Sequence, residues 1–299
     1  MPELPEVETV RRGLLPLIGS KIIRAEVLRD RSVRNHEGGP AAFSADIQGL
    51  AIQAAVRRGK FLWLPLDDAA ALLVHLGMSG QLRVWHDEPA RHPHLRVRFE
   101  LQAADGTALG LDFIDQRTFG HLAIVDLVPT LEGKPGGAGS IQAVIPKPAA
   151  HIARDVLDPN LDTKQVIARI KTKNTEIKRV LLDQTVLSGI GNIYADEALW
   201  KVQIHPQAKA AALSANQISA LITASQQIIA RSLVAGGTSF DALYVNVNGE
   251  SGSNSENLVV YGQAGHPCPN CGTAIERITF MNRSSHLCPT CQRLRKSRR

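Results

Sequence analysis

Residues 268–291 read CPNCGTAIERITFMNRSSHLCPTC and hold all four cysteines of the 299-residue chain. Cys268 and Cys271 form one Cys-x-x-Cys pair, Cys288 and Cys291 form another, and sixteen residues separate the two pairs. Four thiolates at this spacing can close a tetrahedral zinc site that leaves no position open for a catalytic water. The stretch therefore predicts a zinc-finger β-hairpin folded around one structural zinc ion, with a redox-active dithiol pair as the alternative.

The positive charge of the chain is concentrated around this module. The chain carries 34 Lys plus Arg and 28 Asp plus Glu, a formal net charge of +6. No acidic residue follows Glu276, so the last 23 residues carry +7 and the first 276 carry −1. Such a tail suits a polyanion, either nucleic acid or an acidic membrane surface, and a solvated terminus is the alternative.

Composition narrows the class of protein further. The length and the hydrophobic content of 44% are sufficient for one large or two ordinary domains with hydrophobic cores. The sequence contains no uninterrupted run of about 18 apolar residues, so it predicts no membrane span. The start, Met1-Pro-Glu-Leu-Pro-Glu6, lacks the character of a secretory signal, so we expect a cytoplasmic protein in which clustered cysteines favour metal over disulfides.

The residue pattern predicts an α+β protein of two domain types. A helix is expected from Pro5 to about Leu17, and short alternating segments between residues 21 and 128 predict an antiparallel β-sandwich. The glycine-rich stretch 132–140 is the expected linker, because helical periods follow it at 162–171, 175–184, 192–200 and 214–235. The expected domains are a sandwich with flanking helices (1–134), a helical domain (150–245), a mobile loop (246–262) and the cysteine module with its basic tail (263–299).

The N-terminus carries a second chemical signal. Removal of Met1 exposes Pro2, a secondary amine beside Glu3 and Glu6. An α-amino group is unprotonated to roughly a tenth at neutral pH, whereas a lysine is unprotonated to well under about a thousandth. Attack of such an amine on a sugar C1′ gives a cationic iminium ion that acts as an electron sink. Taken alone, the dipeptide is more simply explained as the start of a helix.

Three further segments are candidates for a functional role, although none is diagnostic alone. Gly189-Ile-Gly-Asn192 lies between two helical patterns, so its amides and the following helix could hold a phosphate, with a plain tight turn as the alternative. His75-Leu-Gly-Met-Ser-Gly80 and Asp115-Gln-Arg-Thr-Phe-Gly120 are expected at strand ends or in loops, where ordinary packing is the alternative explanation.

Taken together, these segments resemble the formamidopyrimidine-DNA glycosylases of bacterial base-excision repair. The resemblance covers essentially the whole chain in order, from PELPEVET (2–9) through RGK (58–60), HLGMSG (75–80), DQRTFG (115–120) and LSGIGNIYADE (187–197) to the four-cysteine finger. It implies a bifunctional enzyme for damaged duplex DNA, which we expect to be a monomer. Such an enzyme removes oxidised purines, such as 8-oxoguanine and formamidopyrimidines, and cleaves the abasic strand by β,δ-elimination.

The resemblance also implies a role for each catalytic residue. Pro2 would form a Schiff base at C1′, and Glu3 would be the general acid for sugar opening, with Glu6 in support. Lys60 would contact phosphate and donate a proton in β-elimination, and Arg283 would serve δ-elimination. The four cysteines would hold the zinc ion.

Further residues would bind the DNA. The target base must leave the helix, and the resemblance implies that Met78, Arg117 and Phe119 fill the vacated space. The remaining DNA contacts, mostly with phosphates, would come from His75, His92 and a helix-two-turn-helix module that supplies Lys173, Lys178, Asn192 and Tyr194.

Two departures from the family pattern concern lesion recognition. The lesion-capping loop of the family often contains Gly-Tyr-Phe, but here Gly252 is followed by Ser253 and Asn254. Gln263 stands where an arginine is frequent. Lesion preference depends on these positions, whereas the amine chemistry does not.

Two other functions stay open at this point. An endonuclease VIII-type glycosylase shares Pro2, Glu3 and the finger but prefers oxidised pyrimidines; Arg117 and Phe119 favour the purine class. A noncatalytic zinc-finger DNA-binding protein would share the finger and the basic tail, but it would form no covalent intermediate.

Overall fold

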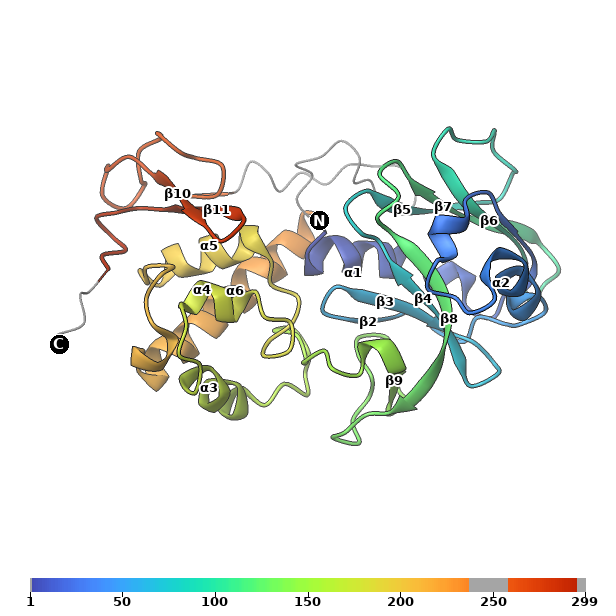
Figure 1. Cartoon of the computed structure of the whole chain (residues 1–299), viewed down its shortest axis with the longest axis horizontal. Coiled ribbons are helices and arrows are strands. Elements are labelled where there is room, and N and C mark those ends of the chain that lie inside the picture. The colour runs from blue at the N-terminus through green and yellow to red at the C-terminus, as the bar shows by residue number, and fades with distance from the viewer. Residues whose placement is uncertain (1, 237–257, 295–299) are drawn as a thin grey trace. The chain divides into compact units, whose positions relative to one another are not determined.

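The computed structural model describes residues 2–236 and 258–294, coloured in Figure 1. The chain divides into two compact units, one that runs up to His151 and one that begins at Ile152 and includes residues 258–294. The first unit thus continues beyond the expected domain end at residue 134. Most of the expected loop 246–262 lies outside the described residues. Among the described helices, none is long and apolar enough to cross a membrane.

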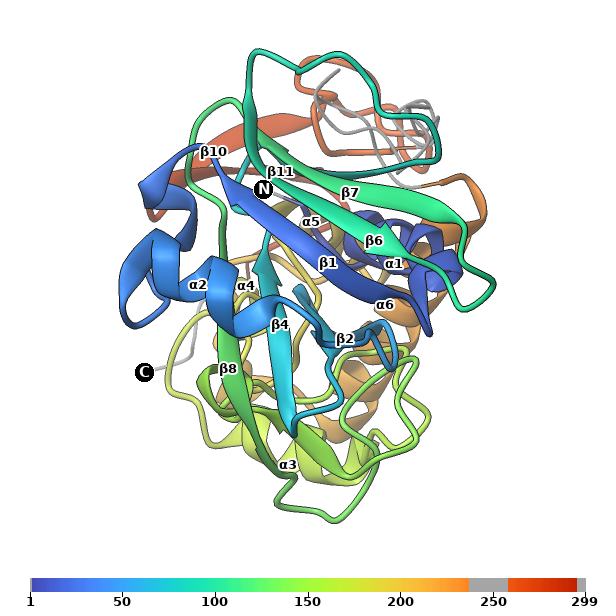
Figure 2. The same cartoon turned by 90° about the vertical axis from the view of Figure 1, so that its right-hand side faces the viewer.

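Two antiparallel sheets form the body of the first unit, as the alternating segments predicted. One sheet has the order β1-β6-β7-β5, and Figure 2 shows β1, β6 and β7 side by side. Its strands are β1 (Lys21–Val27), β5 (Gly80–Trp85), β6 (Leu95–Gln102) and β7 (Ala108–Asp115). The other sheet has the order β2-β3-β4-β8-β9 and comprises β2 (Val56–Arg58), β3 (Phe61–Pro65), β4 (Ala70–His75), β8 (His121–Pro129) and β9 (Val144–Pro146).

One hydrophobic core joins the two sheets and two helices. Leu62 and Val74 enter it from the second sheet, and Val97 and Phe113 enter it from the first. Helix α1 (Leu4–Gly13) adds Val7, and it is followed by a 3₁₀ turn that contains a proline. The structure therefore confirms the expected N-terminal helix but ends its α-helical part earlier, because proline interrupts the α-helical hydrogen bonds.

Helix α2 (Gly39–Ile47) was not predicted from the sequence. It begins after Gly38, whose φ of +82° lies in the left-handed region, and it buries Phe43 and Ile47 against the core. A nine-residue segment that opens with Gly-Pro carries few of the usual helix signals. Tertiary packing of its two apolar side chains therefore decides its structure.

The glycine-rich stretch 132–140 is a packed part of the first unit, not the linker that its composition suggested. Its Ala138 exchanges two backbone hydrogen bonds with Arg57, at 3.0 and 2.8 Å. Arg58 Nε donates to the carbonyl of Gly136 at 2.6 Å. A Cβ on Gly137 would lie 2.2 Å from the carbonyl oxygen of Arg57, so the two backbones touch. Glycine is needed here for close approach rather than for flexibility.

The second unit combines helices with one hairpin. The predicted helices appear as α3 (Thr163–Lys171), α4 (Ile177–Leu181), α5 (Asn192–Lys201) and α6 (Ala215–Val234), of which α4 is shorter than expected. Asp162 caps α3 by accepting the backbone N–H of Gln165 at 3.0 Å. Strands β10 (Glu276–Phe280) and β11 (Arg283–Leu287) pair as the hairpin of the cysteine module.

A buried ion-pair network fastens α1 to β2. Glu8, which is 4% exposed, accepts from Arg57 Nε at 2.9 Å and from two nitrogens of Arg11 at 2.9 Å each. Arg11 also donates to the carbonyl of Ala55 at 3.2 Å. Burial alone would raise the pKa of Glu8, but the hydrogen bond from Arg11 and the charge of Arg57 outweigh it and lower the pKa to about 2.

Replacement of Glu8 by Gln tests this network. Because folding lowers the pKa of Glu8 from 4.5 to about 2, its stabilising effect is full above pH 4.5 and is lost as the pH falls towards 2. We expect E8Q to lower the free energy of unfolding at pH 7 by roughly 3 kcal/mol in urea titrations. The deficit should be clearly smaller at pH 3, and an equal deficit at both pH values would contradict the assignment.

The control for this variant is Glu100→Gln. Glu100 also accepts from an arginine, Arg24, but both side chains of that pair are exposed. Exposed pairs contribute little to stability, so E100Q should change the free energy of unfolding by less than about 1 kcal/mol.

Candidate functional site

Pro2 and Glu3 stand directly before the first turn of α1. Both are buried, and Glu3 is 4% exposed. Glu6 Oε2 accepts the backbone N–H of Glu3 at 2.8 Å, as in a capping box. The structure therefore brings the three N-terminal candidates together at the positive end of a helix, where negative charge is favoured.

Lys60 lies in the turn between β2 and β3 and is half-buried. It follows Gly59, whose φ of +58° lies in the left-handed region. Arg57, the buried partner of Glu8, also donates to the carbonyl of Gly59 at 3.0 Å. One arginine thus fixes both the helix that begins beside Glu3 and the turn that carries Lys60.

The three expected wedge residues lie on two neighbouring loops with exposed side chains. Met78 follows β4, and Arg117 and Phe119 lie between β7 and β8. The Arg117 guanidinium lies 5.1 Å from the centre of the Phe119 ring. Gly77 has a φ of +62°, and a Cβ there would lie 2.5 Å from the backbone nitrogen of Gly120. The two loops therefore touch backbone to backbone.

His75 belongs to a pair of stacked imidazoles beneath these loops. Its ring lies 4.9 Å from that of His121, with 16° between the planes. Burial and the charge of Arg34 lower the pKa of His75, and burial, His75 and Arg34 lower the pKa of His121 to about 4. In both rings the lowered pKa favours the neutral form. A neutral imidazole can form a hydrogen bond but carries no positive charge.

His92 is half-buried, before β6. Its Nδ1 accepts the backbone N–H of His94 at 3.0 Å, which leaves Nε2 as the outer nitrogen. Burial and then the nearby charge of Arg83 lower the pKa of His92. The lowered pKa favours the neutral form of this ring as well.

The four DNA contacts expected in the second unit differ in how exposed their side chains are. Lys173 is partly exposed and lies 3.6 Å from Asp183. The Asn192 side chain donates to the carbonyl of Ser284 at 3.0 Å. Lys178 and Tyr194 are both 0% exposed, so their side chains have interior partners in this structure, not a phosphate-facing position.

Two acidic residues that the sequence reasoning did not single out support the finger. Asp196 on α5 pairs with Lys178 at 2.6 Å and accepts from Ser285 Oγ and the backbone N–H of His286, at 2.8 and 2.9 Å. This carboxylate fastens α5 to β11. Its position inside the motif at 187–197 was visible in the sequence, but its partners, about ninety residues away, were not.

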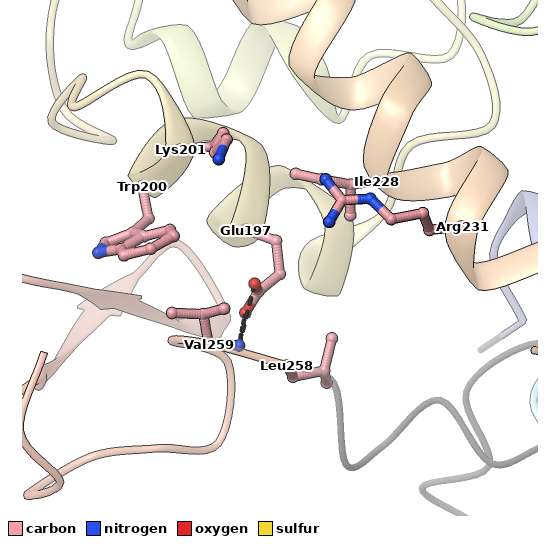
Figure 3. Close-up of a pocket in the computed structure, with 7 residues that line it drawn as sticks. All are labelled: Glu197, Trp200, Lys201, Ile228, Arg231, Leu258 and Val259. Carbon is pink, nitrogen blue, oxygen red and sulfur yellow. Dashed lines mark hydrogen bonds between the residues drawn. The ribbon is translucent and has the colours of Figure 1, made fainter. Parts of the chain in front are cut away.

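Glu197 fixes the chain that leads into the finger. It accepts the backbone N–H groups of Val259, Val260 and Tyr261, at 3.1, 2.8 and 2.8 Å. Burial raises the pKa of Glu197, and the three amides oppose that rise. Figure 3 shows its carboxylate directed at the Val259 nitrogen, in a pocket of about 510 Å³ lined by Glu197, Trp200, Lys201, Ile228, Arg231, Leu258 and Val259.

The four cysteines form a site that fits one zinc ion. Their sulfurs all lie within 4.8 Å of one another. Cys268 and Cys291 are 3.9 Å apart, and Cys271 and Cys288 are 3.4 Å apart. Tetrahedral zinc with bonds of about 2.3 Å needs sulfurs about 3.8 Å apart, close to these values. Arg283 is exposed at the start of β11, beyond the turn of the hairpin.

Comparisons with known proteins match this architecture in order. The formamidopyrimidine-DNA glycosylase N-terminal domain matches residues 1–122, the H2TH domain of the same family matches 152–242, and the zinc finger found in FPG and IleRS matches 265–294. A formamidopyrimidine-DNA glycosylase of Corynebacterium efficiens is 52% identical, over 99% of this chain and 100% of that protein. The chain belongs to the formamidopyrimidine-DNA glycosylase family. Its members are DNA glycosylases with AP lyase activity that act on damaged DNA, and the chain is an enzyme of this kind.

Solved structures of the family agree with the fold. A Lactococcus lactis FPG variant in complex with Fapy-dG-containing DNA has a TM-score of 0.80 and is 30% identical, over 98% of this chain and 100% of that one. The wild-type Lactococcus lactis FPG in complex with DNA containing an oxidised pyrimidine has a TM-score of 0.79 and 29% identity, with the same coverage.

The metal content tests the cysteine site. We expect one zinc ion per chain by elemental analysis, and Cys288→Ser should retain much less than one. The apolar cluster around the cysteines, which includes Val260 and Ile275, is too small to fold alone, so zinc removal should unfold the finger and abolish DNA binding. The two sheets of the first unit should persist.

Thr290→Ala is the control for this test. Thr290 lies in the same knuckle as Cys288 and bonds to Thr273 through its hydroxyl, so T290A should keep its zinc. Full DNA binding by protein shown to be free of zinc would contradict the role of the finger.

Proposed function

We propose that this enzyme excises oxidised purines, such as 8-oxoguanine and formamidopyrimidines, from duplex DNA and cleaves the resulting abasic strand by β,δ-elimination. One observation carries the proposal: a buried ion pair between Glu8 and Arg57 joins the helix that begins after Pro2 and Glu3 to the strand and turn that lead to Lys60. A relative that binds Fapy-dG-containing DNA supports the choice of substrate.

The first half of the reaction uses the N-terminal amine. After Met1 is removed, the Pro2 nitrogen attacks C1′ of the damaged nucleotide, and the base leaves with the electrons of the glycosidic bond and takes up the proton that the amine nitrogen loses. Glu3 protonates the ring oxygen as the sugar opens, and the nitrogen lone pair completes a cationic Schiff base. Glu6 holds the backbone of Glu3 in place during this step.

The second half cleaves the strand. The iminium ion acidifies the hydrogen on C2′, and loss of that proton to solvent expels the 3′ phosphate in the β-elimination, where Lys60 supplies a proton to the departing phosphate oxygen. A further elimination expels the 5′ phosphate, with Arg283 as the finger residue that serves it. Hydrolysis returns Pro2 and leaves a one-nucleotide gap with phosphate at both ends.

The DNA is gripped through its phosphates and through the space left by the base. Met78, Arg117 and Phe119 fill that space, because their side chains are exposed on loops in mutual contact. His75, His92, Lys173, Asn192 and the zinc finger contribute to the grip, so binding weakens with salt. Because the side chains of Lys178 and Tyr194 are buried, we propose that they support the DNA-binding residues from the interior. The proposed enzyme is a monomer in the cytoplasm, associated with the nucleoid.

Oxidised pyrimidines are a second candidate substrate class, because a relative has been solved with such a lesion in its DNA. Duplexes with 8-oxoguanine opposite cytosine and with thymine glycol distinguish the two classes in single-turnover excision assays. We expect faster excision of 8-oxoguanine. Clear preference for thymine glycol would assign the enzyme to the pyrimidine class.

Borohydride trapping tests the covalent mechanism. Enzyme whose intact mass shows loss of Met1 should form a crosslink with abasic DNA, and Pro2→Gly should greatly reduce it. A chain with a non-removable N-terminal extension has no amine at this position, so its crosslink should fall by about a hundredfold. No crosslink from the correctly processed protein would contradict the Schiff-base mechanism.

A further inference from the structure

Asp115, at the end of β7, gathers hydrogen bonds from both wedge loops. It is 0% exposed. One carboxylate oxygen accepts from the Ser79 hydroxyl and from the backbone N–H of Arg117, at 3.2 Å for the latter. The other oxygen accepts the backbone N–H of Gly120 at 2.7 Å. Asp115 thus binds the loop of Met78 through Ser79 and the loop of Phe119 at two points.

The two loops are held to each other as well. Ser79 Oγ accepts the backbone N–H of Arg117 at 3.0 Å, so the hydroxyl bridges the loops. Arg34 donates to the carbonyls of Phe119 and Gly120, at 2.9 and 2.8 Å. The loop after β7 is therefore held through its N–H groups by Asp115 and through its carbonyls by Arg34.

The chemistry of the site requires a carboxylate. Both of its oxygens accept from donors, and an amide can present only one acceptor oxygen, so Asn would turn an NH₂ group towards an N–H or O–H donor. Leaving such buried donors without an acceptor is costly. Both oxygens of Asp115 are thus used by donors of the two loops and not by a ligand.

We infer that Asp115 is a positioning residue for the wedge. It holds Met78, Arg117 and Phe119 in one arrangement before DNA arrives, so that base extrusion does not also have to order two loops. The inference rests on the wedge role proposed above. It predicts that Asp115 matters where a base must be extruded from a stack and matters little to the amine chemistry of Pro2.

The test compares two reactions of Asp115→Asn. Excision of 8-oxoguanine from duplex DNA should slow by about tenfold or more. Borohydride trapping on an abasic site in single-stranded DNA, where no stack has to be filled, should change by less than about twofold. The fluorescence change of 2-aminopurine placed beside the lesion, which reports unstacking, should slow in parallel with excision.

Asp112→Asn is the matched control. Asp112 is a buried carboxylate of the same strand, and it pairs with Arg98 at 2.7 Å instead of binding a loop. D112N should lower the thermal stability at least as much as D115N without changing the ratio of excision to trapping. Ser79→Ala removes only the bridging hydroxyl and should shift the same ratio in the same direction. It serves as the test if D115N folds poorly.

The outcomes separate the two proposals. A wild-type protein that neither excises 8-oxoguanine nor forms the crosslink refutes the proposed function, and this inference with it. With an active wild type, the inference is overturned if D115N and S79A keep the wild-type ratio, or if D112N changes the ratio as much as D115N does.

Discussion

Glu8 of α1 and Arg57 of β2 form an ion pair inside the first unit, and the placement of the N-terminal chemistry depends on it. Both side chains are almost fully buried, so removing either one would leave an uncompensated charge in the interior. Arg57 also holds the Gly59 carbonyl before Lys60, and Glu8 lies on the helix that begins beside Glu3. One contact therefore joins the helix that follows the amine and the acid to the turn that carries the lysine.

Buried carboxylates hold other segments of the chain in the same way. Asp115 collects donors from two loops, Asp196 collects them from β11, and Glu197 accepts three successive backbone amides before the finger. In each case a buried carboxylate fixes a segment that bears functional side chains. Acidic residues thus position functional segments in both units, whereas the net charge of +6 arises from the basic finger and tail.

The sequence predicted those structural features that depend on residues close together in the chain. The spacing of Cys268 and Cys288 with their partners is sufficient to indicate zinc, and α3, α5 and α6 follow from helical periodicity. Long-range partners decided the rest. Glycines at 136 and 137 suggested a linker, but Gly136 allows close contact with Val144 of β9 and Gly137 allows close contact with Arg57 of β2. Lys178 was expected at the surface because nothing in its neighbourhood reveals the ion pair with Asp196.

The central claim is that the nucleophile is the N-terminal proline held beside Glu3, not a lysine. Peptide mapping of the borohydride-reduced crosslink by mass spectrometry tests this claim most directly. Our account predicts that the sugar adduct is on the peptide that begins at Pro2, attached to its nitrogen. An adduct on Lys60, or on any other lysine, with an unmodified N-terminal peptide would contradict it.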